Sequence, residues 1–252
     1  MSAEVSDSSA GLQPTPSTYT STSVSADQAA PSGRNRKCGL LTTGDVILFT
    51  GDSITDAFRK PDEINIAYQL GSGYALMIGA RLMSEFSDAR FHFLNRGISG
   101  QRVTQLAERW DRDCLDLSPS VVSILVGVNS TLEKFKNQGS FEDSDAEGFA
   151  KIYGGLLDRL VSRHPKVRLV LCEPFLLPCG VVTPEMIEDV RERGRSVQRL
   201  AERYQAVFVP FQSAFDRAMK MAPAEYWAYD GIHPTAAGFW LLAETWLNHV
   251  VR

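Results

Sequence analysis

The sequence predicts an α/β fold in which a five-stranded, mostly parallel sheet lies between two layers of helices. Short runs of β-branched and other apolar residues alternate with longer stretches of helical periodicity, the order that builds a doubly wound α/β/α sandwich. Several of the short runs, such as Val121–Val126 (VVSILV), are apolar at nearly every position. Such runs are typical of strands covered on both faces, which favours a parallel sheet.

This pattern gives five strands and five long helices. The expected strands are Asp45–Thr50, Phe91–Asn95, Val121–Val126, Val167–Cys172 and Ala206–Val209. The expected helices are Tyr74–Phe86, Val103–Leu117, Glu147–Arg163, Pro184–Tyr204 and Ala236–Val250. In sheets of this kind ligands bind beyond the carboxyl ends of the strands, so the residues that follow each strand are the first candidates for a site.

The chain of 252 residues is expected to hold one folded domain, residues 39–252, after an N-terminal tail. Residues 1–38 are rich in Ser, Thr, Ala and Pro. They cannot bury enough apolar surface to offset the entropy of ordering them, so we expect this tail to be disordered. The tail lacks the apolar segment of a signal peptide, and no run approaches the ~20 apolar residues of a membrane helix, which favours a cytoplasmic protein.

The net charge and the spacing of the cysteines limit which binding partners and metal sites are expected. The net charge is −4, and without a dense cationic patch we expect no nucleic-acid partner and no binding to an anionic membrane. The cysteines form no CxxC pair and no ligand cluster with the four histidines, so no metal site is expected. We expect reduced thiols, although the sequence leaves a disulfide open, and it also leaves the oligomeric state open, a homo-oligomer included. The cysteines are Cys38, Cys114, Cys172 and Cys179.

A serine follows the first expected strand, within Gly51–Asp56 (GDSITD). Between a strand end and a helix start, the Ser53 hydroxyl would be exposed, and the N–H groups of the helix N-terminus favour a developing negative charge. A nucleophilic serine needs such stabilisation as well as a base. The segment differs from the Gly-x-Ser-x-Gly turn of α/β-hydrolases. The alternative is that Ser53 or Thr55 only caps a helix.

Two further strand ends carry candidate hydrogen-bond donors. The second strand leads into Asn95–Gly100 (NRGISG), where the Gly97 N–H can approach the site closely because glycine has no side chain. The third leads into Gly127-Val128-Asn129-Ser130, where the Asn129 amide can donate to an oxyanion. Each segment also reads as an ordinary strand-to-helix turn.

The last motif is Asp230-Gly231-Ile232-His233-Pro234, ahead of the last expected helix. An aspartate three residues before a histidine can accept from Nδ1–H and leave Nε2 free to act as a base. The other three histidines, His92, His164 and His249, lie in a strand or at helix ends, where a structural or solvent-exposed role is expected.

Taken in order, these four motifs resemble the four sequence blocks of the GDSL/SGNH hydrolases, and the resemblance covers about Thr43 to Val250. It implies a flavodoxin-like SGNH hydrolase fold and a serine esterase that needs no cofactor. It also implies that Ser53 is the nucleophile, that His233 is the general base and acid, and that Asp230 orients His233. The oxyanion hole would be formed by the Ser53 N–H, the Gly97 N–H and the Asn129 side chain. The third block usually reads Gly-x-Asn-Asp, whereas Ser130 follows Asn129 here.

Within this family the sequence is most similar to the acetylxylan-esterase-like members that deacetylate carbohydrates. The resemblance therefore implies a carbohydrate or small-molecule ester as substrate, with a short acyl group removed. Asp52, Phe175 and Trp227 are the candidates for contact with this substrate. The alternatives are a lysophospholipase or thioesterase on the same triad, and a catalytically silent carbohydrate-binding protein.

Overall fold

The computed structural model describes residues 39–137 and 140–251. The predicted disordered tail, residues 1–38, and with it Cys38, lies outside the described residues. The described residues from Gly39 onward belong to one compact unit. None of the helices in this described part is both long and apolar enough to span a membrane.

The centre of the fold is a sheet of five parallel strands in the order β2-β1-β3-β4-β5. The strands are β1 (Val46–Gly51), β2 (His92–Asn95), β3 (Val121–Leu125), β4 (Arg168–Cys172) and β5 (Val207–Val209). The chain first moves from β1 to one neighbour and then returns to β3 on the other side. The crevice between the carboxyl ends of β1 and β3 is the point where ligands bind in doubly wound sheets. The predicted α/β fold with a parallel sheet is confirmed.

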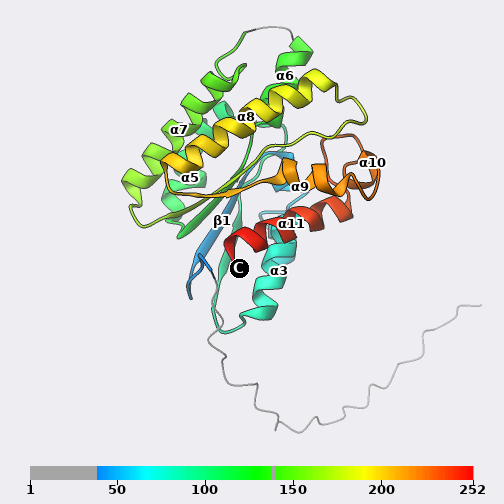
Figure 1. Ribbon diagram of the computed structural model, residues 1–252. Coiled ribbons are helices and arrows are strands. Elements are labelled where there is room, and N and C mark those ends of the chain that lie inside the picture. The colour runs from blue at the N-terminus through cyan, green and yellow to red at the C-terminus, as the bar shows by residue number, and fades with distance from the viewer. Residues whose placement is uncertain (1–38, 138–139, 252) are drawn as a thin grey trace, which may run out of the picture. The chain divides into compact units, whose positions relative to one another are not determined.

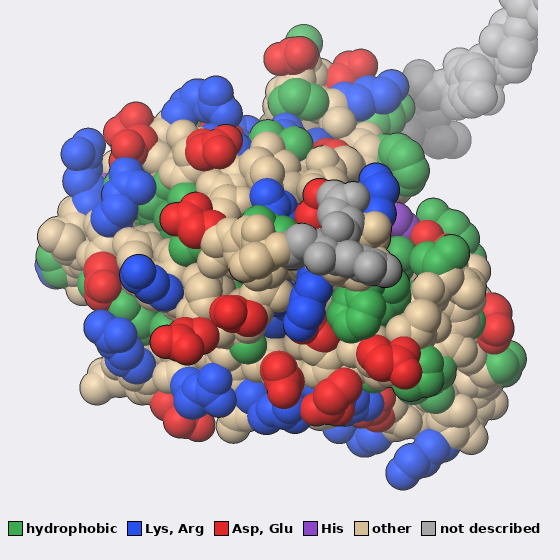
Figure 2. Space-filling view, turned by 90° about the horizontal axis from the view of Figure 1, so that it is seen from above, with side chains coloured by type: hydrophobic (Ala, Val, Ile, Leu, Met, Phe, Trp, Pro, Cys, Tyr) green, Lys and Arg blue, Asp and Glu red, His purple; other side chains and the backbone are tan. Residues whose placement is uncertain are grey.

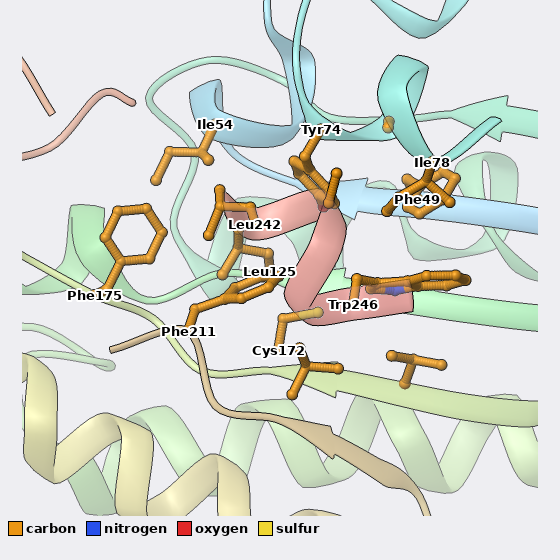
Figure 3. Packing of buried hydrophobic residues seen from close by; sticks show 14 of the residues in the cluster. Phe49, Ile54, Tyr74, Ile78, Leu125, Cys172, Phe175, Phe211, Leu242 and Trp246 are labelled. Carbon is orange, nitrogen blue, oxygen red and sulfur yellow. The ribbon is translucent and has the colours of Figure 1, made fainter. Parts of the chain in front are cut away.

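Alternating side chains of the strands enter two separate cores. Ile47 and Phe49 of β1 pack on one face of the sheet, while Leu48 between them packs on the other. Because both faces are covered by helices, neither set can be polar. On the first face the Phe49 ring packs against Trp246 of the covering helix α11, with 5.7 Å between ring centroids (Figure 3). This two-sided burial is the reason why the strand sequences are mostly apolar.

The sheet is covered on both faces by helices, as Figure 1 shows, with α3 and α11 on one side and α5, α7 and α8 on the other. The N-terminus of α11 is capped by Thr235, whose Oγ1 accepts from the Gly238 N–H at 3.2 Å. The helices are α1 (Ser53–Asp56), α2 (Ile66–Leu70), α3 (Tyr74–Glu85), α4 (Val103–Glu108), α5 (Trp110–Asp113), α6 (Val128–Asn137), α7 (Ala146–Arg163), α8 (Pro184–Arg203), α9 (Phe211–Ala218), α10 (Ala224–Trp227) and α11 (Ala236–Val250), with a 3-10 turn η1 (Leu115–Leu117).

The structure corrects the prediction of one continuous helix over Val103–Leu117. This stretch is divided into α4, α5 and η1, and the first break falls at Arg109, which has φ −108° and ψ 7°. The Arg109 side chain turns inward at this break and bonds to the ends of β1 and β2. Helical periodicity continues across the break because both pieces bury residues against the same core.

Candidate active site

The nucleophile candidate Ser53 lies where β1 passes into α1. Asp52 caps this helix, since its Oδ1 accepts from the Ile54 N–H at 3.1 Å. Ser53 is half-buried as the first residue of α1. Its backbone N–H has no hydrogen-bond partner among the described residues. A free N–H beside a serine hydroxyl can stabilise negative charge that develops next to that hydroxyl.

His233 and Asp230 approach Ser53 from the far end of the sequence. Ser53 Oγ lies 3.0 Å from His233 Nε2, and His233 Nδ1 lies 2.7 Å from Asp230 Oδ2. The other carboxylate oxygen of Asp230 accepts from the backbone N–H groups of Ile232 at 2.9 Å and His233 at 2.7 Å. These bonds fix the carboxylate against the histidine backbone. The three predicted residues are therefore brought together in a Ser-His-Asp array.

The electrostatics of Asp230 favour its ionised form. Partial burial raises the pKa of this carboxyl, but the hydrogen bonds from the His233 ring and from two backbone N–H groups outweigh burial and hold the pKa below its usual value. An ionised Asp230 accepts a hydrogen bond from the Nδ1–H and so leaves Nε2 free to take the Ser53 proton. The arrangement has the geometry and charge that nucleophilic catalysis by serine requires.

Asp52 differs from Asp230 in its surroundings. Its side chain is fully buried, and Oδ2 has no hydrogen-bond partner among the described residues. Burial raises the pKa of Asp52 to about 7, although the Ile54 N–H bond and the nearby His233 lower it. Asp52 is closed off from solvent, which argues against the predicted contact with a substrate. In the structure Asp52 is the N-cap residue of α1, directly before Ser53.

Asp52→Asn should raise the free energy of unfolding at pH 8, and this gain should shrink toward pH 5. The folded Asp52 pKa of about 7 lies above its usual 3.8, so the folded protein holds a proton in this window that the unfolded chain has released. The wild type therefore loses stability as the pH rises, and the loss is complete above about pH 7. The two values set an upper limit of about 4 kcal/mol on the loss. Asparagine keeps the cap and does not ionise.

The measurement is urea unfolding of the wild type and Asp52→Asn between pH 5 and pH 8. Asp145→Asn is a matched control, because Asp145 is an exposed cap of α7 whose Oδ1 accepts from the Gly148 N–H at 2.7 Å. Its difference from wild type measures the effect of the amide without burial. A gain for Asp52→Asn that is equal at pH 5 and pH 8 would contradict a buried Asp52 that ionises in this window.

The structure corrects the predicted donor in the loop after β2. The Gly97 N–H donates to Asn95 Oδ1 at 2.8 Å, so it is engaged within its own loop. The close approach expected of Gly97 is to α1 instead, because a Cβ at this position would lie 2.3 Å from the Asp56 nitrogen. Gly100 is the alternative in the same loop. It has φ +78°, is exposed, and has an N–H without a partner among the described residues.

Asn129 lies in the first turn of α6, beside Gly100. The two residues line one hollow of about 330 Å³, together with Arg102 and Gln105. The Asn129 Nδ2 donates to Gln101 O at 3.1 Å. Since an amide nitrogen carries two hydrogens, this bond orients the group and leaves one hydrogen for another acceptor.

Ser130, which stands where the family usually has aspartate, is fully buried. Its hydroxyl donates to Asp143 Oδ2 at 2.7 Å. Asp143 Oδ1 in turn accepts from Arg102 Nη1 at 2.7 Å. A carboxylate is thus present behind Asn129, but it comes from the segment before α7.

The two aromatic candidates for substrate contact differ in their burial. Phe175 is fully buried and packs on Phe211 (Figure 3) and also on Phe215 in the core. Trp227 is half-buried against the same core, and its Nε1 donates to Ala222 O at 3.3 Å. Sequence reasoning missed Tyr229, which is 63% exposed and stacks on the His233 ring at 6.0 Å between centroids. Its position directly before Asp230 was the available signal.

Neither the remaining histidines nor the described cysteines are hydrogen-bonded to the triad side chains, although Cys179 lies beside the turn that carries Asp230. His164 Nε2 bonds to Leu115 O at 2.8 Å, and His249 Nδ1 bonds to Thr245 O at 2.8 Å, while His92 is exposed. The free thiols of the described part are all buried, and they are Cys114, Cys172 and Cys179. Within residues 39–137 and 140–251, His, Cys, Asp and Glu side chains form no group of three or more that could hold a metal ion.

The upper face of the molecule carries charges of both signs. Figure 2 looks down on Figure 1 from above and shows Lys and Arg interspersed with Asp and Glu, and a histidine beside hydrophobic side chains. This mixture is typical of an ordinary solvated surface.

Comparison with known proteins identifies the family. Residues 49–241 match the GDSL-like lipase/acylhydrolase family. The chain belongs to this family. The match includes the segments that carry Ser53, Gly97, Asn129, Asp230 and His233. The predicted resemblance is confirmed, and the chain is a serine esterase of the GDSL type.

GDSL relatives with the same fold include esterases that act on carbohydrate. The chain is 30% identical to an acetylxylan esterase of Geobacillus stearothermophilus over 218 residues, which are 83% of this chain and 95% of that protein. A solved structure of an acetylxylan esterase from the same organism has a TM-score of 0.75 at 28% identity, over 84% of this chain and 99% of that one. A solved structure from Parabacteroides merdae, described as a GDSL-like lipase, has a TM-score of 0.79 at 38% identity. The match covers 85% of this chain and 98% of that one.

Proposed function

We propose that this GDSL esterase hydrolyses carboxylic esters through Ser53, His233 and Asp230, and that it removes acetyl groups from a carbohydrate. The observation that supports the triad most directly is the chain of contacts from Ser53 Oγ to His233 Nε2 at 3.0 Å and from His233 Nδ1 to Asp230 Oδ2 at 2.7 Å. Both distances are within hydrogen-bond reach: the first allows proton transfer between Ser53 and His233, and the second lets Asp230 orient the His233 ring.

The mechanism is two-step acyl transfer. Ser53 Oγ attacks the ester carbonyl while its proton passes to His233 Nε2, and a tetrahedral oxyanion forms. Collapse breaks the bond to the alcohol, which leaves with the proton from Nε2, and the acyl group stays on Ser53. Water then gives a proton to Nε2 and attacks the acyl-serine; the carboxylic acid leaves, and Ser53 regains its proton. Asp230 stabilises the histidine while it is charged.

The proposed oxyanion hole has three donors on three loops. They are the Ser53 N–H, one Asn129 amide hydrogen, and the Gly100 N–H in place of Gly97. The Ser53 and Gly100 N–H groups have no partner among the described residues. Gly100 and Asn129 border the same hollow. Donors that are free and held by rigid elements stabilise a developing oxyanion without reorganising.

The choice of an acetylated sugar rests on the relatives and on Tyr229. Two of the comparisons above are with acetylxylan esterases, of which solved structures include catalytic mutants with a serine or an aspartate replaced by alanine. In this chain the exposed Tyr229 ring lies nearly parallel to the His233 ring, with 18° between their planes. An exposed aromatic face beside a catalytic base offers a stacking surface for a sugar ring on the alcohol side of the ester.

The test compares substrates that differ in acyl length and in alcohol. We expect kcat/KM to be higher for p-nitrophenyl acetate and butyrate than for the decanoate, and acetylated xylooligosaccharides to release acetate. Values that rise steadily with acyl length would instead favour the lysophospholipase or thioesterase alternative. No turnover of any of these esters by the folded protein would favour a silent carbohydrate-binding protein.

In the same experiment, the variant Tyr229→Ala distinguishes recognition of the sugar alcohol from recognition of the acyl group. Loss of the ring should raise KM for the acetylated sugar about threefold to tenfold, as expected for one aromatic contact of ~1 kcal/mol. The KM for p-nitrophenyl acetate should change less. Tyr226→Ala is the control, since Tyr226 is also exposed but packs on Trp227 and not on His233. Equal effects of the two variants would remove Tyr229 from sugar recognition.

A further inference from the structure

We propose that Arg109 is a positioning residue that holds the donors of the oxyanion hole in place. Its guanidinium joins the loops that follow β1 and β2, and it reaches Asn129 after β3 through Gln101. This inference rests on the proposed function, because it requires that these donors stabilise an oxyanion.

The Arg109 guanidinium is buried at the carboxyl ends of β1 and β2. Its side chain is only 5% exposed. Nη2 donates to Gly51 O at 3.2 Å, and Nη1 donates to Arg96 O at 2.7 Å. Nε donates to Gln101 Oε1 at 2.5 Å. One planar group therefore binds three acceptors from two loops.

The first acceptor lies next to the nucleophile. Gly51 is the last residue of β1 and stands two positions before Ser53. Its carbonyl oxygen accepts from Arg109 and also from the Ile98 N–H at 3.1 Å. The Ser53 loop and the loop of Gly100 are thus joined at one oxygen atom, and a shift of Arg109 would move both.

Gln101 extends the connection to the third loop. Its side-chain oxygen accepts from Arg109, while its backbone oxygen accepts from Asn129 Nδ2 at 3.1 Å. Gln101 also follows Gly100 directly in the sequence. The proposed Asn129 and Gly100 donors therefore both depend on the position of Gln101, which Arg109 fixes.

The chemistry of the Arg109 side chain suits this positioning role. Asp113 Oδ2, 3.2 Å from Arg109 Nη1, balances the charge. A buried charge is expensive, and an apolar side chain of similar volume often stabilises such a position equally well. Arginine offers several donors in one rigid plane, whereas lysine is a single point charge on a flexible stem. The contacts of Arg109 require several donors in one plane, since three of its acceptors lie at the ends of β1 and β2 and in the loop that follows β2.

The experiment is a double-mutant cycle between Arg109→Lys and Asn129→Ala, with p-nitrophenyl acetate as substrate. We expect Arg109→Lys to lower kcat about tenfold to a hundredfold, with KM within about threefold, because positioning acts in the transition state. In the Asn129→Ala background the same change should cost at least about fivefold less, since one of the donors it positions is already absent. Gln101→Ala repeats the cycle if Arg109→Lys does not fold.

Arg168→Lys is the structural control. Arg168 also bonds to a backbone carbonyl, Leu40 O at 2.7 Å, and pairs with Asp45, but it lies at the opposite ends of the strands. We expect it to lower the melting temperature and to leave kcat within about twofold in the folded fraction. Losses that multiply in the double variant, or an Arg109→Lys enzyme with the same kcat as Arg168→Lys, would overturn the inference. Failure of the proposed function would differ from both, since the wild type itself would not cleave the ester.

Discussion

Ser53→Ala should lower kcat for p-nitrophenyl acetate by roughly 10⁴-fold or more, because the residual rate comes from the oxyanion hole and binding alone. The Ser53 hydroxyl is half-buried and bonds to His233 Nε2 at 3.0 Å. Its removal leaves Asp230 and His233 paired. The free energy of unfolding should therefore change by no more than about 1 kcal/mol.

The measurement combines steady-state kinetics with urea unfolding of the same preparation. Ser213→Ala is the matched control, because it removes an exposed hydroxyl from α9, a helix that carries none of the triad residues. The control should keep both activity and stability. Turnover by Ser53→Ala close to that of Ser213→Ala would remove Ser53 from the mechanism.

Asn129→Ala should lower kcat by roughly 10²–10³-fold, or about 3–4 kcal/mol, with little change in KM. The Asn129 amide uses one hydrogen on Gln101 O and has the other for the oxyanion. An interaction that strengthens only in the transition state affects kcat and leaves substrate binding intact. If the role of Asn129 is purely structural, the substitution should instead lower the free energy of unfolding, while the folded fraction keeps its kcat.

The control for this variant is Asn65→Ala. Asn65 caps the exposed start of α2, where its Oδ1 accepts from the Ala67 N–H at 2.9 Å. Its loss should cost about 1 kcal/mol of stability and leave kcat unchanged. A kcat for Asn129→Ala within about threefold of wild type, with the fold intact, would refute the oxyanion role and leave the hole to its backbone donors.

The strands were predictable because burial on both faces leaves little choice of residue. All five lie within one residue of the expected bounds at each end. The helix α11 is also predicted to the residue, since Thr235 caps it. In contrast, α9 was missed although Phe211, Ala214, Phe215 and Ala218 have helical spacing and are all buried. At eight residues the segment is too short for periodicity to separate it from a loop.

The site was predictable where a motif fixes geometry by itself. Asp230 and His233 are three residues apart, and a turn of that length brings a carboxylate to Nδ1. Which glycine of the second loop has a free N–H depends instead on the Asn95 side chain, whose contact with Gly97 is a tertiary property. Aromatic identity likewise did not reveal that Phe175 is buried and Tyr229 exposed. Such differences arise from packing, which a local pattern does not record.

The pairing of Ser130 with Asp143 means that the acidic group behind Asn129 is supplied from another part of the chain. The Ser130 hydroxyl lies 2.7 Å from an Asp143 oxygen, and both side chains are closed to solvent. An aspartate at position 130 would set a second carboxylate against Asp143, whose side chain is already paired with Arg102. Restoring the usual family residue at this single position would therefore introduce electrostatic repulsion. The buried space that the side chains at positions 130 and 143 share therefore suits one carboxylate and not two.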